Sequence, residues 1–125
     1  MLTNTVGWFE IYVQDMDRAK KFYESVLQIQ LSDMPTGDDS MLMSAFPCEM
    51  NTYGAGGALA QMQGFSSGGN SVLVYFSCDD CAVQASRVVA NGGQVFKEKL
   101  SIGEYGHIAL AIDTEGNMFG LHSTQ

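Results

Sequence analysis

Apolar and polar residues alternate in the same way in two stretches of the chain. Residues 6–15 (VGWFEIYVQD) and 70–80 (NSVLVYFSCDD) are β-rich runs that end at acidic residues. After each run the apolar positions change to helical spacing, which predicts a strand followed by a helix. A carboxylate accepts hydrogen bonds from the free N–H groups of a first helical turn, so Asp15 and Asp79 are predicted to cap the two helices.

Three strand candidates follow each predicted helix. Their ranges are roughly 29–34, 41–47 and 57–63 in the first half and roughly 94–99, 106–113 and 117–123 in the second. Residues 91–93 (NGG) end the second helix, and residues 113–117 (DTEGN) form a turn signal between the last two strands. The polar stretch GFSSGGN (64–70) is interpreted as a linker.

The repeat predicts one domain over residues 1–125, made of two βαβββ modules at about 3–63 and 71–123. A lone module of this kind leaves a sheet face and its edges bare, so the two copies are expected to pair. We predict an α+β fold in which the modules form a curled mixed sheet or barrel around a central pocket.

Alternation within the strands predicts which residues face that pocket. In the first strand Phe9, Ile11 and Val13 are uniformly apolar and are expected on the helix side. In the seventh strand Ile108, Leu110 and Ile112 are predicted on the helix side, with His107, Ala109 and Ala111 opposite. In the last strand Phe119 and Leu121 are also predicted to lie on the helix side. The ligand-binding set predicted for the pocket is Trp8, Glu10, Tyr12, Phe76, His107 and His122.

Composition narrows the classes of partner. The chain has 125 residues, 46% of them hydrophobic, which is enough for a buried core. Fourteen acidic and six basic residues give a net charge of -8, which disfavours nucleic acid and anionic membrane surfaces. No apolar run approaches the roughly 20 residues that cross a bilayer, and residues 1–10 lack the pattern of a signal peptide. A cytoplasmic location is expected.

The three cysteines form an odd set, for which structural disulfides are not expected. Cys78-Asp79-Asp80-Cys81 has the spacing of a CxxC redox motif. Two intervening carboxylates raise a thiol pKa, however, and a zinc site needs two further ligands at matching spacing. Neither redox nor zinc chemistry is favoured.

Four stretches of the chain carry a family resemblance. They are WFEIYVQDMDRAKKFYESVL (8–27), GGALAQM (56–62), VYFSCDDCAVQASRVVANGGQV (74–95) and DTEGNMFGLHS (113–123). Together they resemble the vicinal oxygen chelate superfamily, which contains glyoxalase I, bleomycin-resistance proteins and extradiol dioxygenases. The resemblance implies two βαβββ modules whose sheets curl around a bore, commonly within a homodimer. One departure is Gln28, where the family often has a glycine that ends the first helix.

A second departure concerns the metal. Metal-dependent members place His or Glu ligands in the first and last strand of each module. Carried over, these positions fall on Trp8, Ala60 (or Gln61), Val72 and Gly120. A divalent ion needs at least three good donors, so neither a metal nor another cofactor is expected.

Two classes of function stay open. One is binding of a small organic molecule, as in bleomycin-resistance proteins. The other is an enzyme of the superfamily, a lyase, isomerase or dioxygenase. It would use Glu10 and His107 as an acid–base pair, with burial raising the pKa of Glu10, or a relocated metal on Glu10, His107 and His122. Alternatively, Glu10 is an architectural anchor, Trp8 is core, and His122 lies in solvent or a subunit interface.

Overall fold

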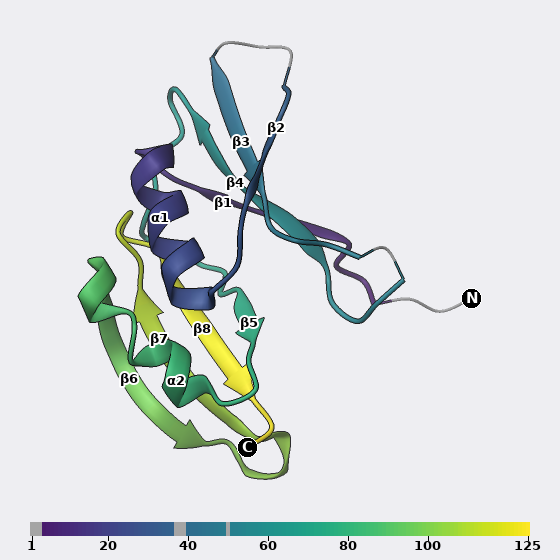
Figure 1. Cartoon of the computed structure of the whole chain (residues 1–125), viewed down its shortest axis with the longest axis vertical. Helices are drawn as coiled ribbons and strands as arrows, with labels where there is room; N and C mark the ends of the chain where they lie inside the picture. The colour runs from purple at the N-terminus through teal and green to yellow at the C-terminus, as the bar shows by residue number, and fades with distance from the viewer. Residues whose placement is uncertain (1–3, 37–39, 50) are drawn as a thin grey trace.

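The computed structural model describes residues 4–36, 40–49 and 51–125. The first half of the chain contains β1 (Trp8–Tyr12), α1 (Met16–Leu27), β2 (Ser32–Met34), β3 (Met41–Ala45) and β4 (Gly56–Met62). The second half contains β5 (Tyr75–Ser77), α2 (Cys81–Ala85), β6 (Gln94–Ser101), β7 (His107–Ile112) and β8 (Met118–Ser123) (Figure 1). Two short 3₁₀ helices, η1 (Val89–Asn91) and η2 (Gly103–Tyr105), flank β6. The predicted order of elements, βαβββ twice, is confirmed.

Each half forms its own four-stranded mixed sheet. The strand orders are β1-β4-β3-β2 and β5-β8-β7-β6. In both sheets the first and last strands of the module pair in parallel and the remaining neighbours are antiparallel. The α+β class is therefore confirmed, whereas the described strands form two separate sheets and no closed barrel.

Helix α1 begins and ends as its sequence predicts. The side chain of Asp15 accepts a hydrogen bond from the backbone N–H of Arg18 at 3.2 Å. The helix ends at Gln28, whose φ of 56° is left-handed. A residue with a Cβ adopts this conformation at a cost of about 1 kcal/mol.

Helix α2 differs from its prediction. Its N-cap is Asp80, not Asp79, because the Asp80 carboxylate accepts from the backbone N–H of Ala82 at 3.0 Å. The helix also stops at Ala85, and η1 continues the segment as far as Asn91. The hydroxyl of Ser86 donates to the carbonyl of Val83 at 2.6 Å, a local bond that competes with the helical ladder.

One hydrophobic core joins the two halves. Helix α1 buries Ala19, Phe22, Tyr23 and Val26 against both sheets. Aromatic rings connect the modules with centroid distances between 5.1 and 5.9 Å, and the rings are those of Phe22, Tyr23, Phe46, Phe76 and Phe119. Phe76, which the sequence assigned to the ligand pocket, thus lies on the helix side, packed against this core.

The predicted facing of β7 is wrong. Ala109 and Ala111 lie opposite Leu121 and Phe119 of β8, and all four are buried. Directly opposed residues project to the same face of a sheet, so the alanines are on the helix side. The larger Ile108, Leu110 and Ile112 face the other way and are half-buried.

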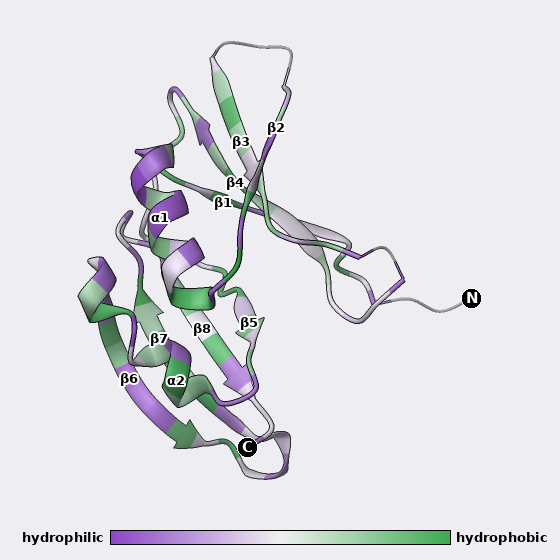
Figure 2. Ribbon diagram, viewed as in Figure 1, coloured by the Kyte–Doolittle hydropathy of each residue, from purple (hydrophilic) through white to green (hydrophobic). Residues whose placement is uncertain are grey.

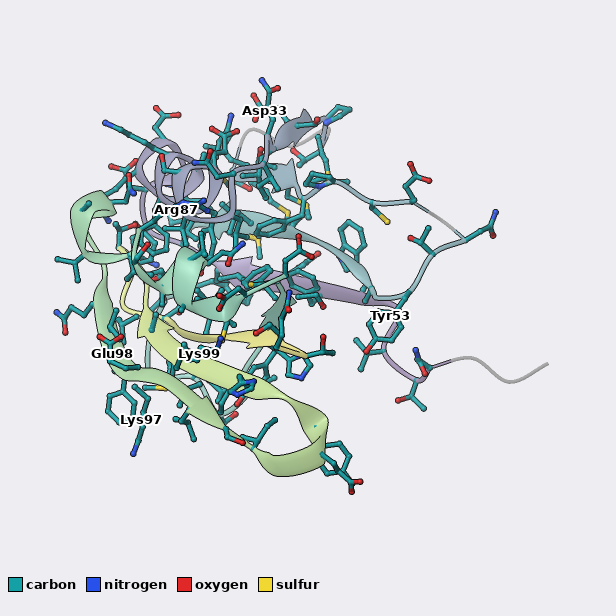
Figure 3. All side chains as sticks on the ribbon, turned by 60° about the horizontal axis from the view of Figure 1, so that its bottom comes forward. Asp33, Tyr53, Arg87, Lys97, Glu98 and Lys99 are labelled. Atoms are coloured by element: carbon teal, nitrogen blue, oxygen red, sulfur yellow. The ribbon has the colours of Figure 1, made fainter. Side chains whose placement is uncertain are left out.

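The edge strand β6 is polar at its centre. Figure 2 shows a hydrophilic middle section in β6, and Figure 3 shows Lys97, Glu98 and Lys99 along it. Charged residues and register shifts, which β6 has on both sides of Lys97, discourage pairing with another chain at an open edge.

Candidate functional site

A three-residue cluster occupies one face of β1. The indole Nε1 of Trp8 donates to Glu10 Oε2 at 3.2 Å, and the hydroxyl of Tyr12 donates to Glu10 Oε1 at 2.9 Å. Alternation places these side chains opposite Phe9 and Ile11, as the sequence predicts. Trp8 is 44% exposed and Glu10 is exposed, so the predicted burial of this carboxylate is wrong.

Small residues of β4 form the floor beside this cluster. Trp8, Glu10 and Tyr12 lie next to Gly56, Ala58 and Ala60, respectively. Both alanines have no exposed surface. We call the face of this sheet that carries Glu10 its inner face. Large side chains there stand beside small ones, which gives the face an uneven surface suited to a pocket.

A cavity of about 220 Å³ opens beside Glu10, where the two halves of the chain meet. Its wall comes from β1, from the connecting segment and from β8, and includes Glu10, Tyr12, Asn70, Val72 and Met118. The side chain of Asn70 holds β8 in place, because it donates to the Met118 carbonyl at 3.0 Å and accepts from the Met118 N–H at 3.2 Å.

Tyr12 is held as a hydrogen-bond donor. Its hydrogen bond to Glu10, then burial and the charge of Glu10, raise the pKa of the Tyr12 phenol above its ordinary value. The ring of Phe65 stacks on that of Tyr12, with centroids 5.2 Å apart and planes 22° apart. A carboxylate offers about four acceptor positions, so Glu10 can accept further donors from a ligand.

The two histidines lie away from this cluster. His107 is opposite Ser123 on the helix side of β7, and its Nδ1 is buried with no hydrogen-bond partner among the described residues. His122 is on the other face, with Nε2 2.7 Å from the carbonyl oxygen of Tyr105. Glu10 and His107 belong to different sheets and project to opposite faces, so the structure does not assemble the predicted acid–base pair.

The family model of the Glyoxalase/Bleomycin resistance protein/Dioxygenase superfamily matches residues 5–121. The chain belongs to this superfamily. It is 31% identical over 122 residues to a candidate glyoxylase, CFP32, of Mycobacterium bovis, a match that covers 95% of this chain and 44% of the relative. The chain thus spans less than half the length of that relative.

Solved structures of the superfamily share the fold. Glyoxalase I from Zea mays superposes with a TM-score of 0.73 at 19% identity, over 94% of this chain and 45% of that chain. A glyoxylase/bleomycin resistance protein/dioxygenase domain from Frankia sp. EAN1pec superposes with a TM-score of 0.72 at 13% identity, over 99% and 100% of the two chains. None of the helices in the described residues is long and apolar enough to span a membrane.

The metal-ligand positions of the superfamily hold no suitable donors in this chain. The positions assigned by the resemblance, Trp8, Ala60, Val72 and Gly120, offer an indole, a methyl, an isopropyl group and a hydrogen atom. The alternative to Ala60, Gln61, has one neutral side-chain oxygen, and this oxygen accepts from the Met16 N–H at 2.8 Å. At Gly120 the ring of Tyr75 lies where a Cβ would stand, so the space for a longer ligand is filled. Within the described ranges, no three His, Cys, Asp or Glu side chains are grouped to hold a metal, including Glu10, His107 and His122. These residues do not fit a divalent ion.

The cysteine motif also lacks the features of a reactive site. Cys78 and Cys81 are free thiols, and Cys81 is fully buried. Burial, followed by the neighbouring Cys81, raises the pKa of Cys78 to about 11. Because the thiolate is the nucleophile, Cys78 is poorly reactive near neutral pH.

The residues that hold the site in position were not predicted from the sequence. The turn 113–117, interpreted only as a turn, buries Asp113, Glu115 and Asn117 near the start of α1. Glu115 accepts from the backbone N–H groups of Gln14 and Asp15 at 2.9 and 3.0 Å and from Arg18 Nε at 2.7 Å. Asn117 Nδ2 donates to the Tyr12 carbonyl at 2.9 Å. We name Asp113, Glu115 and Asn117 the junction clamp, because they tie β8 to the strand that carries Glu10.

Proposed function

We propose that this chain binds a small organic molecule beside Glu10, without the divalent ion used elsewhere in the superfamily. The observation that carries the proposal is an exposed carboxylate, oriented by two aromatic donors, at the mouth of a 220 Å³ cavity. An apolar pocket with a few convergent polar groups is the usual form of a small-molecule site.

The surroundings of Glu10 define the chemistry of the ligand. The carboxylate only accepts hydrogen bonds, so the ligand needs an N–H or O–H donor, and an amine adds a favourable charge. Val72 and Met118 line the cavity, and the Trp8 indole stands beside its mouth. An apolar or aromatic body with a donor group therefore matches this site.

The pocket is proposed to work within a homodimer. The inner face of the first sheet leaves methionines half-buried, and these are Met34, Met41, Met43 and Met62. Two relatives of similar fold or sequence are about twice as long, since the chain covers 44% of one and 45% of the other. A second copy of this chain would supply the same amount of structure and cover these side chains.

The fluorescence of Trp8, the single tryptophan, reports on ligands directly. We expect titration with a panel of aromatic amines and alcohols that includes benzylamine to change this fluorescence. Glu10→Gln keeps the shape of the side chain and removes its charge, so it should weaken amine binding at least about tenfold, as expected for a lost charged hydrogen bond.

The matched control is Asp33→Asn. Asp33 is also an exposed carboxylate of the first sheet, but it lies on the helix side, 2.9 Å from Lys20 Nζ. This variant should bind the panel as the parent does. A panel that never changes Trp8 fluorescence, or equal affinities for parent and Glu10→Gln, would contradict the proposed function.

A further inference from the structure

A second cavity, of about 300 Å³, lies on the helix side of the junction between β1 and β5. Aromatic residues dominate its lining on the helix side, and these are Phe9, Phe46 and Phe76, with Tyr53 at the rim. The ends of α1 and α2 contribute Leu27 and Gln84. This aromatic cavity is lined from both halves of the chain and exists only when they are joined.

The aromatic cavity is separate from the site at Glu10. Phe9 projects from β1 to the side opposite Glu10, and Phe76 packs against the helix-side core. The two cavities share a single lining residue, Val74. A ligand in one therefore does not contact the polar groups of the other.

The rim of the aromatic cavity is unusually exposed. Tyr53 projects from the β3–β4 loop and is 89% exposed (Figure 3). The Tyr53 ring, left in solvent beside an open cavity, adds to the apolar surface that a ligand would bury.

One polar atom in the wall lacks a partner. Gln84 Oε1 is buried and makes no hydrogen bond with the described residues. An unsatisfied buried acceptor costs free energy, and a ligand donor would recover it once the Gln84 side chain turns Oε1 into the cavity. Gln84 therefore selects for a ligand that carries an O–H or N–H group.

We infer that the aromatic cavity is a second small-molecule site, which takes one aromatic ring with a hydrogen-bond donor. A cavity of about 150 Å³ lined by Leu, Ile and Phe is enough to bind benzene, so twice that volume admits a substituted ring. The rings of Phe9, Phe46 and Phe76 supply edge and face contacts, and Gln84 orients the donor.

Phenol and anisole test this site as a matched pair of probes. They share one ring, but only phenol donates a hydrogen bond. In two-dimensional NMR, phenol should shift the backbone signals of Gly54, Ala55 and Ser77, which line the cavity. Phenol should bind the parent about three- to tenfold more tightly than anisole, the advantage of one neutral hydrogen bond.

Substitutions separate the donor contact from the cavity itself. Gln84→Met keeps the length of the side chain and removes the acceptor. The affinity for phenol should therefore fall to the affinity for anisole. Ala55→Trp, at an exposed position of the rim, should block both probes. Gln30→Met, a matched change at an exposed residue outside the cavity, should leave both affinities unchanged.

The outcome is independent of the site at Glu10. Glu10→Gln should not change phenol binding here, so the two proposals fail separately. Equal binding of phenol and anisole by the parent, or a preference for phenol that survives Gln84→Met, would overturn the role of Gln84. Phenol shifts absent from Gly54, Ala55 and Ser77 would overturn the site.

Discussion

Two glutamates at the junction of the modules are used in opposite ways. The side chain of Glu115 has no exposed surface and accepts hydrogen bonds from Gln14, Asp15, Arg18 and Thr114. Glu10 is exposed, and among the described residues it accepts hydrogen bonds from two neighbours on its own strand. A carboxylate whose acceptor positions are filled inside the protein holds the architecture, whereas one with free positions facing solvent can hold a ligand.

The charge of Glu115 follows from its partners. Burial alone would raise the pKa of Glu115, but hydrogen bonds from Arg18, Thr114 and the backbone of Gln14 and Asp15 lower it to about 2. Its neighbour Asp113 shows the reverse balance, because burial raises its pKa despite hydrogen bonds from Tyr23 and Asn117. The junction clamp therefore contains one firmly ionised and one more readily protonated carboxyl.

The largest expected effect comes from removing the buried glutamate. Glu115→Ala leaves the N–H groups of Gln14 and Asp15 without their acceptor and Arg18 without its ion-pair partner. We expect the free energy of unfolding to fall by about 3 kcal/mol, measured by urea denaturation. Glu104→Ala, at an exposed position of η2, should change it by less than about 0.5 kcal/mol. A loss below about 1 kcal/mol at Glu115 would show that the clamp does not hold the modules.

Acidification should weaken the same clamp. Because the pKa of Glu115 is lower in the folded chain than the ordinary 4.5, its contribution is present above pH 4.5 and is lost as the pH falls through about 2. The pKa shift sets an upper limit of about 3 kcal/mol on this contribution to the free energy of unfolding. The real contribution is smaller, because Arg18 is half-exposed and solvent screens its charge.

Asp113 has the opposite sign, because its carboxyl pKa is raised in the folded chain. Its contribution to stability is fully present below its ordinary pKa of 3.8 and is lost as the pH rises from there through the raised folded pKa. We expect a net loss of about 2 kcal/mol between pH 5 and pH 2 from urea midpoints. The loss should be smaller in Glu115→Gln. An identical acid profile in parent and variant would assign the pH dependence to other groups.

A pair of tyrosines extends the comparison to hydroxyl groups. Tyr23 is fully buried and its hydroxyl donates to Asp113 Oδ2 at 2.6 Å, whereas the hydroxyl of Tyr12 donates to exposed Glu10. Tyr23→Phe should cost about 1–2 kcal/mol of unfolding free energy because a buried acceptor loses its partner. Tyr12→Phe should cost less than about 0.5 kcal/mol. Equal costs would remove the distinction between the two regions.

The smallest expected effect on stability is at Glu10 itself. Since the carboxylate is exposed and, within the described part of the chain, its hydrogen bonds come from Trp8 and Tyr12, Glu10→Gln should change the free energy of unfolding by less than about 0.5 kcal/mol. Thermal melts of parent and variant should coincide within a few degrees. A melt lowered by 10 °C or more would make Glu10 an architectural residue like Glu115.

Sequence patterns succeed here where the two faces of a strand differ in polarity. On β1 the apolar Phe9 and Ile11 alternate with Trp8, Glu10 and Tyr12, so the facing could be predicted correctly. On β7 both sets are apolar, and only the packing of α2 against alanines decides between them. His107 was misplaced for this reason.

Contacts distant in sequence were beyond prediction. Glu115 and Gln14 are separated by 101 positions, and no local pattern in either segment predicts the hydrogen bond between them. The DTEGN stretch supports a turn by local rules, and its burial depends on where α1 begins in space. The βαβββ repeat needed no such contacts, since periodicity and caps are local.

The most direct test of the account is the Trp8 fluorescence titration with benzylamine, done on the parent and on Glu10→Gln at equal concentration of folded protein. The account predicts a saturable change for the parent, an affinity at least about tenfold weaker for the variant, and coincident melts for both. Equal affinities of parent and variant would contradict the claim that Glu10 binds a ligand. A weaker affinity accompanied by a melt lowered as much as that of a Glu115 variant would contradict the claim that Glu115, and not Glu10, stabilises the fold.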